Sequence, residues 1–339
     1  MIELDGAEGE GGGQMLRTAL TLSAITGRSF RIRHIRAKRA KPGLMHQHLM
    51  AVQAVAAVCG AEHSPVDVGV SELEFHPRAI RAGDYTFDIG TAGSTTLVLQ
   101  SLMPVLLHAD GPSSVRVSGG THNPMAPPAH YLDRAFGRVL RQMGATFELE
   151  LERFGFYPRG GGRLALNIVP CRRLQPIELL LRGVRTNAYA EAFVAGIAPA
   201  LARRELEILC PAFDLGETDC RMCGLPGDQG PGNTVMLTIE YTHMTEIFSA
   251  IGERGVSAET VAQRVVDEAR RYAGSEGAAG EHLADQLLLP FALAGGGAYS
   301  MTHLSQHTLT NAEVVQRFLP VRIVFSRGAH RTVCMVEAG

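Results

Sequence analysis

Three polar residues follow recurring glycines at the same distance, and their types suit chemistry on a phosphate. Glycines at 6, 9, 27 and 60 recur 84 positions later, and three of them recur again at 274, 277 and 295. Twelve residues after the third glycine of each set stand Arg39, Asn123 and His307. Arginine binds phosphate through two donors, and a neutral imidazole is a nucleophile. The spacing therefore predicts three repeats whose equivalent loops form one composite active site.

The segment around His307 predicts a nucleophile beside an anion site. Thr310-Asn-Ala-Glu313 has the pattern of a capping box, which predicts a helix over residues 312–318 and places His307 three residues before the helix start. Backbone N–H groups at a helix start favour an anion, so a phosphate would be held beside the imidazole. Nearby cations would favour the neutral, nucleophilic ring. The alternative is a solvated loop histidine, one of thirteen in the chain.

Six cations fall within eleven residues at the first of the three loops. The run comprises Arg31, Arg33, Arg36, Lys38, Arg39 and Lys41. Arg31 and Arg33 alternate with Ile32, so they share one face of a strand. A solvated charged edge that discourages strand pairing is one interpretation. The position of the run, equivalent to the His307 loop, favours phosphate binding instead.

A glycine-rich turn from Glu8 to Gln14 joins the first predicted strand to the first predicted helix. Its glycines allow backbone N–H groups to approach a phosphate, although no Gly-Lys-Ser/Thr follows as in a Walker A loop. The carboxylates of Glu8 and Glu10 could bind Mg²⁺ or Mn²⁺ between the protein and a nucleotide. A tight turn with exposed acids is the alternative.

Polar residues recur on the first predicted helix of each repeat. Arg17, Gln100 and the pair Asp285 and Gln286 lie nine to eleven residues before the closing glycine. Equivalent polar positions on otherwise apolar helices predict a shared cleft. Three unrelated polar groups, each satisfied locally, are the alternative.

The elements that must position these residues follow an αβαββ plan. Each glycine-rich turn precedes an apolar helix that we expect to end at Gly27, Gly111 or Gly295, because glycine is a common helix stop. An alternating strand follows, and then an amphipathic helix over 45–59 or 128–143 in the first two repeats. Paired strands close those repeats, 66–75 with 85–89 and 146–151 with 163–169. We predict an α+β fold in which each repeat is a four-stranded sheet with two helices.

The repeat spacing also predicts an inserted domain. Repeats one and two are 84 residues apart and repeats two and three are 184 apart, which leaves about a hundred extra residues. We therefore predict a catalytic domain from residues 1–180 and 275–339, with repeats at about 1–84, 85–180 and 275–339. An inserted α/β domain would span 181–274, with helices over 188–207 and 257–272 and a strand over 233–241.

Composition excludes several classes of protein. The 339 residues are 45% apolar and 19% charged, which is typical of soluble globular proteins, and a net charge of −2 limits nucleic-acid contacts to a local basic patch. No apolar stretch is long enough to span a membrane, and Glu3 and Asp5 stand where a signal peptide would carry cations. Six cysteines without framework spacing predict a reduced, cytoplasmic protein, with zinc or redox work at Cys220-Arg-Met-Cys223 as the minor alternative.

Taken in order, the motifs resemble those of the RNA 3′-terminal phosphate cyclases. They span nearly the whole chain: 5–14, 36–43, 90–94, 118–121, 123–128, 155–162, 228–233, 283–286 and 307–311. One position departs from the family pattern, because the glycine signature at 155 ordinarily follows Arg or His and here follows Phe154.

The resemblance implies a nucleotidyl-transferring ligase that acts on RNA 3′-phosphate ends with ATP and with Mg²⁺ or Mn²⁺. ATP adenylylates a histidine, AMP moves to the RNA to give RNA(3′)pp(5′)A, and the 2′-hydroxyl displaces AMP to leave a 2′,3′-cyclic phosphate. The implied catalytic residues are His307, Arg39, Arg36 and Asp285, and the implied metal contact is Glu10. The implied ATP contacts are Gln100, Pro127, His282, Leu283, Ala284, Asp285 and Gln286. The implied phosphate and RNA contacts are Arg17, Arg36, Arg39 and Gln47.

Three hypotheses differ in their chemistry. An active cyclase would form the histidine adenylate. A non-catalytic RNA-processing relative would lack the histidine, so His307 together with Arg39 and Glu10 argues against it. An enolpyruvyl transferase of related architecture would turn over phosphoenolpyruvate without ATP. The sequence carries no signal for the physiological RNA, the oligomeric state, the metal preference or the role of the insertion.

Overall fold

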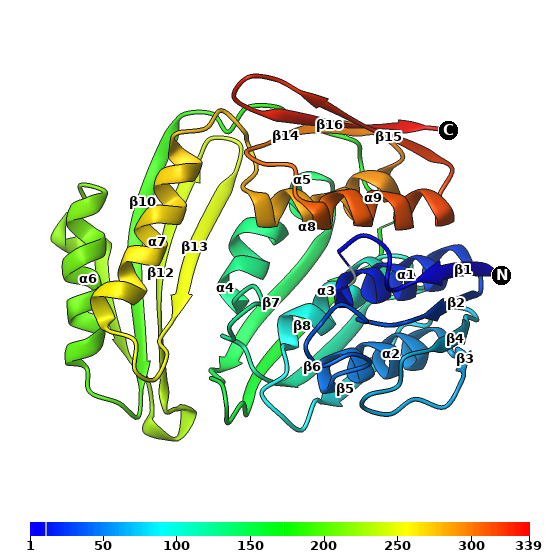
Figure 1. Cartoon of the computed structure of the whole chain (residues 1–339), viewed down its shortest axis with the longest axis horizontal. Coiled ribbons are helices and arrows are strands. Elements are labelled where there is room, and N and C mark those ends of the chain that lie inside the picture. The colour runs from blue at the N-terminus through cyan, green and yellow to red at the C-terminus, as the bar shows by residue number, and fades with distance from the viewer. Residues whose placement is uncertain (11, 172) are drawn as a thin grey trace.

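The structure is a computed structural model that describes residues 1–10, 12–171 and 173–339. The strands of these residues form four four-stranded sheets, of which three share one strand order (Figure 1). They are β1 (Ile2–Asp5), β2 (Phe30–Arg33), β4 (Leu73–His76) and β3 (Glu62–His63); β5 (Asp84–Asp88), β6 (Ser113–Gly119), β8 (Gly162–Val169) and β7 (Thr146–Arg153); and β9 (Glu178–Leu179), β14 (Gly297–Met301), β16 (Thr332–Ala338) and β15 (Val321–Arg327). In each sheet the first pair is parallel and the other pairs are antiparallel. The predicted α+β fold of repeated units is confirmed.

Two helical segments accompany each of these sheets. They are α1 (Gly13–Thr26) and α2 (His46–Cys59); α3 (Thr95–Leu106) and α4 (Ala129–Tyr131), which continues through a π-helical turn (Leu132–Phe136) into α5 (Gly137–Gln142); and α8 (Glu281–Ala294) and α9 (Gln306–Phe318). Gly27 and Gly295 end α1 and α8 with φ of 70° and 74°, a left-handed conformation that glycine adopts without strain. The helix α3 ends at Leu106, short of the predicted stop at Gly111, because the chain passes there into tighter turns.

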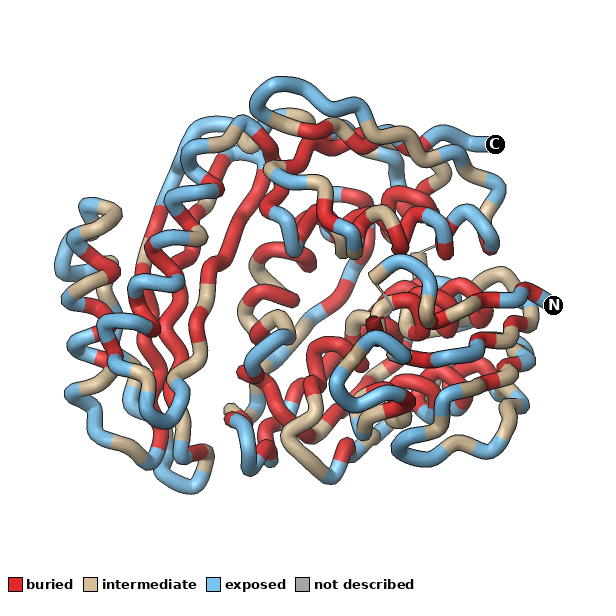
Figure 2. Tube along the Cα trace, viewed as in Figure 1, coloured by how far each residue is buried: buried red, intermediate tan, exposed pale blue. Residues whose placement is uncertain are grey.

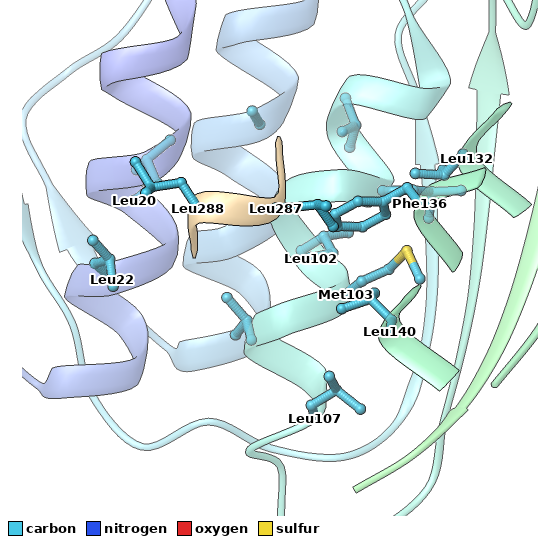
Figure 3. Close-up of a cluster of buried hydrophobic side chains, with 14 of the residues drawn as sticks. Leu20, Leu22, Leu102, Met103, Leu107, Leu132, Phe136, Leu140, Leu287 and Leu288 are labelled. Carbon is cyan, nitrogen blue, oxygen red and sulfur yellow. The ribbon is translucent and has the colours of Figure 1, made fainter. Parts of the chain in front are cut away.

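The hydrophobic core lies where the helices of the three repeats meet. Buried residues concentrate on these helices and on the inner faces of the sheets (Figure 2). Figure 3 shows leucines of α1, α3 and α8 converging with Phe136 and Leu140. Burial of this apolar surface is the main favourable term that holds the repeats together. The polar residues at the ends of these helices are therefore carried on a rigid frame.

A fourth sheet is formed by residues between β9 and α8. Its order is β11 (Cys220–Gly224), β10 (Arg185–Ala195), β12 (Gly232–Tyr241) and β13 (Thr245–Ile251), and it has its own apolar cluster with α6 (Ala200–Ala212) and α7 (Ala258–Ala273). The expectations of a strand at 233–241 and of a helix at 257–272 are confirmed. Residues 188–195 were expected to be helical and instead form most of β10. Small residues at every second position there pack against α6 and α7, and this period of two indicates a strand.

Two features of the repeats differ from the sequence expectation. β9 pairs in parallel with β14, so the third sheet takes its first strand from residues ahead of the insertion rather than from the range that begins at 275. The strand expected over 66–75 is limited to β4, which pairs with β2 and β3, whereas residues 84–88 belong to the second sheet. The division of the chain into domains at 180 and 275 stays a prediction, but the sheet topology places the insertion inside repeat three.

The cysteines also depart from the expectation of a fully reduced protein. Cys210 and Cys220 form a disulfide between α6 and the start of β11, whereas Cys223 is a free thiol. The disulfide includes Cys220, so only Cys223 of the CxxC pair keeps a free thiol. Among the described residues, no cluster of three His, Cys, Asp or Glu side chains is arranged to hold a metal ion. In the same part of the chain, no helix is long and apolar enough to cross a membrane.

Candidate active site

A cleft of about 810 Å³ opens where the three repeats meet the inserted sheet. One wall is formed by α1, α2, α3, α8 and α9 with the loops that precede them, and the other by β13 and α7 of the insertion. Most of the predicted site residues line it: Arg17, Arg36, Arg39, Gln47, Gln100, Asn123, Pro127, His282, Asp285, Gln286 and His307. The predicted shared cleft is therefore present, with residues from all three repeats.

His307 is the second residue of α9, not part of a loop ahead of a helix. Ser305 caps the helix, because its hydroxyl accepts from the backbone N–H of Thr308 at 3.1 Å. The predicted capping box fails because Thr310 is buried in the second turn, where its hydroxyl donates to the carbonyl of Gln306. The earlier start holds the imidazole in the first helical turn, where free N–H groups still favour an anion.

The imidazole of His307 faces acidic and amide groups of the first repeat. Its Nε2 lies 3.4 Å from Oε1 of Glu10, and its Nδ1 lies 3.1 Å from Oε1 of Gln14. Arg39 Nη2 pairs with the same oxygen of Glu10. An imidazole, a carboxylate and a guanidinium from chain segments about 300 residues apart thus meet beside the cleft, whose lining includes His307 and Arg39 but not Glu10.

The backbone around Glu10 is held by the third repeat. The N–H of Glu10 donates to the Thr310 hydroxyl at 3.1 Å, and a Cβ on Gly9 would lie 2.2 Å from that same oxygen. Gly9 also has a φ of 54°, so glycine is needed there for both conformation and space. Lys38 Nζ donates to the Gly9 carbonyl at 2.9 Å, which attaches the basic loop to the glycine-rich turn. Gly11, within that turn, lies outside the described residues.

Gln14 connects His307 to the half-buried carboxyl group of Asp285. Its amide Nε2 donates to Oδ1 of Asp285 at 2.6 Å. Burial raises the pKa of Asp285, while the bond from Gln14 and the nearby His307 and Arg17 oppose that rise. The carbonyl of Asp285 accepts from Asn311, whose Oδ1 accepts from the Thr18 hydroxyl at 2.8 Å. These bonds tie α1, α8 and α9 together beneath the imidazole.

The basic wall of the cleft contains fewer free cations than the sequence predicts. Arg31 pairs with Glu72 and Glu74 on the outer face of the first sheet, as does Arg33 with Glu72. Arg36 donates to the carbonyls of residues 41 and 43 at 2.7 and 2.8 Å, so its guanidinium holds the loop closed.

The cations that remain give this wall a positive potential. Burial lowers the pKa of Arg17 to about 10, which leaves it charged at neutral pH. Burial, together with Arg17 and Arg36, lowers the pKa of His48 to about 3. That part of the cleft suits an anion.

The predicted ATP contacts divide into two groups. Gln100, Pro127 and Gln286 line the cleft, and His282 lies at its rim with Nε2 3.8 Å from Glu268. Leu283 and Ala284 do not line it, because their side chains are fully buried in the hydrophobic core. Since α8 places successive side chains about 100° apart, a run of five residues cannot all face one cleft.

Unpaired polar atoms mark the cleft as a place where a ligand could bind. Within the described part of the chain, five buried side-chain polar atoms have no hydrogen-bond partner, and three of them belong to cleft residues: Asn123 Oδ1, the Tyr131 hydroxyl and Gln286 Oε1. A buried polar atom without a partner is costly unless something else satisfies it.

The three loops that the glycine spacing aligns are not structurally equivalent. The connections from strand to second helix are residues 34–45, 120–128 and 302–305, so the third is much the shortest. His307 is the second residue of its helix, and the matching positions in the other repeats are Gln47 and His130. Gln47 lies in the cleft, where its Oε1 accepts from the N–H of Ser94, whereas His130 is half-buried against His122 outside the lining.

The site offers a metal ion one protein ligand, the carboxylate of Glu10, at the point where His307 and Arg39 meet. Among the described residues, no three-ligand cluster accompanies it. Mg²⁺ commonly binds one or two carboxylates and takes its remaining ligands from substrate phosphates and water. The site therefore fits a cation that bridges Glu10 and a nucleotide, not a cation enclosed by protein.

Several residues at the site were missed by sequence reasoning. Gln14 contacts His307, Thr310 supports Glu10, and Tyr131 presents an unpaired hydroxyl. The only signal for Gln14 was its position at the end of the glycine-rich turn. Thr310 was interpreted only as a helix cap, and no signal marked Tyr131.

A comparison with known protein families identifies the family of this chain. The family model of RNA 3′-terminal phosphate cyclase matches residues 8–325. Among solved structures, the chain is similar to the enolpyruvyl transferase NikO from Streptomyces tendae, at 14% sequence identity and a TM-score of 0.39. That match covers 98% of this chain and 48% of the other, so this chain spans about half the length of that enzyme. A structural likeness at this level carries no argument.

Proposed function

Because the chain belongs to the RNA 3′-terminal phosphate cyclase family, we propose that it converts RNA 3′-phosphate ends to 2′,3′-cyclic phosphates with ATP, through an adenylate on His307. One observation carries the proposal. The Nε2 atom of His307 lies in a cleft of nucleotide size, 3.4 Å from Glu10, and Arg39 reaches the same carboxylate. A nucleophile, an acid and a cation are thus together where a phosphate would bind.

The first step is transfer of the adenylyl group to the protein. Nε2 of His307 attacks the α-phosphorus of ATP, a P–N bond forms, and the bond to the bridging oxygen breaks to release pyrophosphate. Arg39 and Arg17 offset charge on the phosphate oxygens, as does the start of α9. A divalent cation bound by Glu10 would neutralise phosphate charge and orient the leaving group.

The second and third steps take place on the RNA. An oxygen of the RNA 3′-phosphate attacks the adenylyl phosphorus, the P–N bond breaks, and His307 is regenerated. The ribose 2′-oxygen then attacks the 3′-phosphorus and AMP leaves, while the hydroxyl proton passes to solvent. The last attack is intramolecular, so the protein mainly has to hold the 2′-oxygen in line. Arg36 and Gln47 lie in the same wall and would contact the RNA phosphate.

The test is covalent labelling with ATP that carries a radioactive α-phosphate. We expect an acid-labile, alkali-stable label on the wild type and none on His307→Ala. The matched control is His303→Ala, which removes an exposed histidine four positions earlier that does not line the cleft. A label of equal intensity on His307→Ala would refute the assignment.

A second assay follows the RNA. An oligonucleotide with a labelled 3′-phosphate should become resistant to phosphatase only in the presence of ATP and the wild-type protein. A protein that binds this RNA but forms neither adenylate nor cyclic end would instead be a non-catalytic RNA-processing factor.

A further inference from the structure

We propose that Gln14 is a positioning residue that fixes the proton of His307 on Nδ1, so that Nε2 presents its lone pair to the phosphate. This inference rests on the proposed function for its catalytic consequence, but its geometric part stands alone. Gln14 lies between two polar side chains of the third repeat, with Asp285 on one side and His307 on the other.

The orientation of the Gln14 amide follows from Asp285. An ionised carboxylate only accepts hydrogen bonds, so the end of the amide 2.6 Å from Oδ1 of Asp285 must be the NH₂ group. Burial raises the pKa of this carboxyl group, and the positive charge of Arg17 beside it opposes the rise and favours the ionised state. The carbonyl end of Gln14 therefore points at the imidazole.

The orientation of the amide determines the tautomer of the imidazole. Nδ1 of His307 lies 3.1 Å from the Gln14 carbonyl oxygen, which can only accept, so Nδ1 must carry the proton. In the neutral ring the other nitrogen, Nε2, is then unprotonated. Nε2 lies 3.4 Å from Oε1 of Glu10, farther than the 3.1 Å contact at Nδ1, and that carboxylate oxygen already accepts from Arg39, so it competes less well for the ring proton. A proton on Nε2 would block attack and leave two acceptors facing each other at Nδ1.

The same bond would assist the reaction as it proceeds. When Nε2 attacks the α-phosphorus, the ring acquires positive charge, and a hydrogen bond from Nδ1 to a carbonyl becomes stronger when its donor is charged. Gln14 would thus contribute more in the transition state than in the ground state, which is the condition for raising the rate.

The three residues are held by elements that cannot shift independently. Gln14 lies in the first turn of α1, Asp285 in the second turn of α8 and His307 in the first turn of α9. The Asn311 side chain links these helices, because it donates to the carbonyl of Asp285 and accepts from Thr18 of α1. The amide is therefore positioned before any ligand binds.

The first test reads the tautomer without ATP. In ¹⁵N-labelled protein, two-bond ¹H–¹⁵N spectra distinguish the two ring nitrogens, and the His307 signals are those missing from His307→Ala. We expect the neutral ring of the wild type to carry its proton on Nδ1. In Gln14→Met and Asp285→Asn we expect a mixture of tautomers. A wild-type ring with its proton on Nε2, or an unchanged spectrum in both variants, would overturn the inference.

The second test measures adenylate formation at saturating ATP. Gln14→Met should slow it roughly 10- to 100-fold, the value of one hydrogen bond to a charged group, with little change in ATP affinity. Gln14→Glu combined with Asp285→Asn keeps an acceptor for Nδ1 and reverses the donor and acceptor on the other side, so this double variant should recover much of the rate. The control is Gln263→Met, which removes a similar amide-to-carboxylate bond, to Asp267 at 2.7 Å, on the exposed face of α7.

The outcomes separate the inference from the proposed function. If the wild type forms no adenylate, the proposed function fails, and the spectra still decide the tautomer. If the wild type forms the adenylate and Gln14→Met does so at the same rate, the inference fails. A loss of ATP affinity with an unchanged rate in Gln14→Met would also refute it, since that result describes a binding residue.

Discussion

Replacement of Glu246 by Gln should remove a large pH dependence of stability. Glu246 lies on β13 of the insertion, is 3% exposed, and accepts from the backbone N–H of Gly280 at the start of α8. Burial raises its pKa to about 8; Glu268 adds to the rise, and Gly280 and Arg182 oppose it. The contact joins the insertion to the third repeat, so its protonation state bears on how firmly the two are attached.

The sign follows from proton linkage. Between about pH 4.5 and pH 8 the folded protein keeps the proton that the unfolded chain has released, so the free energy of unfolding falls as the pH rises. The stabilisation is fully present below the ordinary pKa of 4.5 and is lost as the pH passes through about 8. At about 1.36 kcal/mol per pH unit, the whole range amounts to roughly 5 kcal/mol.

Urea unfolding of the wild type and of Glu246→Gln, at several pH values between about 5 and 8, measures this contribution. Glutamine keeps an acceptor for Gly280 and never ionises, so the variant should lose far less stability as the pH rises. Glu205, whose pKa burial raises to about 7, is present in both proteins and cancels in the difference. A difference between the two proteins that stays constant over this pH range would refute the reasoning.

Two further substitutions have defined outcomes. Arg39→Lys keeps the positive charge beside Glu10 but loses the planar guanidinium with its paired donors. The rate of adenylate formation should fall about tenfold, which corresponds to one charge-assisted hydrogen bond, and the stability should not change. Rapid-quench labelling measures this rate, and a rate equal to that of the wild type would contradict the prediction. Asn311→Ala should lower the free energy of unfolding by about 2–3 kcal/mol, because the buried Thr18 hydroxyl loses its acceptor. An unchanged urea midpoint would count against a structural role for the Asn311 side chain.

The repeats could be predicted from the sequence because the glycines that mark them are required by the local backbone conformation. Glycine at the end of α1 and α8 reflects a left-handed residue that other side chains rarely adopt, so the period of the fold is visible in the sequence. Loop length is not constrained in this way. The connection ahead of α9 is short, and counting from Gly295 therefore aligned His307 with Arg39 instead of with Gln47.

The errors arose where tertiary packing decides the structure. Residues 188–195 contain four alanines, which favour a helix locally, but in β10 three of them (Ala188, Ala190 and Ala192) are buried in the apolar cluster with α6 and α7. Thr310 has the sequence of a helix cap and is instead buried inside α9, where it supports Glu10.

The missed site residues have the same origin. The role of Gln14 depends on contacts with residues 271 and 293 positions away, and no local pattern contains them. Arg39 and Glu10 could be singled out because their signals are local: an arginine in a basic loop suggests phosphate binding, and a carboxylate in a glycine-rich turn suggests a metal ion held beside a nucleotide.

The position of the insertion explains why the cleft is electrically asymmetric. In the first two repeats a glycine-rich turn joins the first strand to the first helix, whereas in repeat three the inserted chain occupies that junction, between β9 and α8. The start of α1 has no acidic residue in its first turn, and Arg39 lies beside it. The start of α8 carries Glu281, and Glu246 of the insertion accepts from its N-cap.

Two topologically equivalent helix ends therefore have opposite preferences for charge. A nucleotide in this cleft would find its favourable phosphate position at α1, next to His307, and would meet acidic and neutral groups at α8. If the proposed function holds, the insertion would do more than extend the wall of the cleft: with acidic groups at the start of α8, ATP would bind with its phosphates toward α1 and the imidazole.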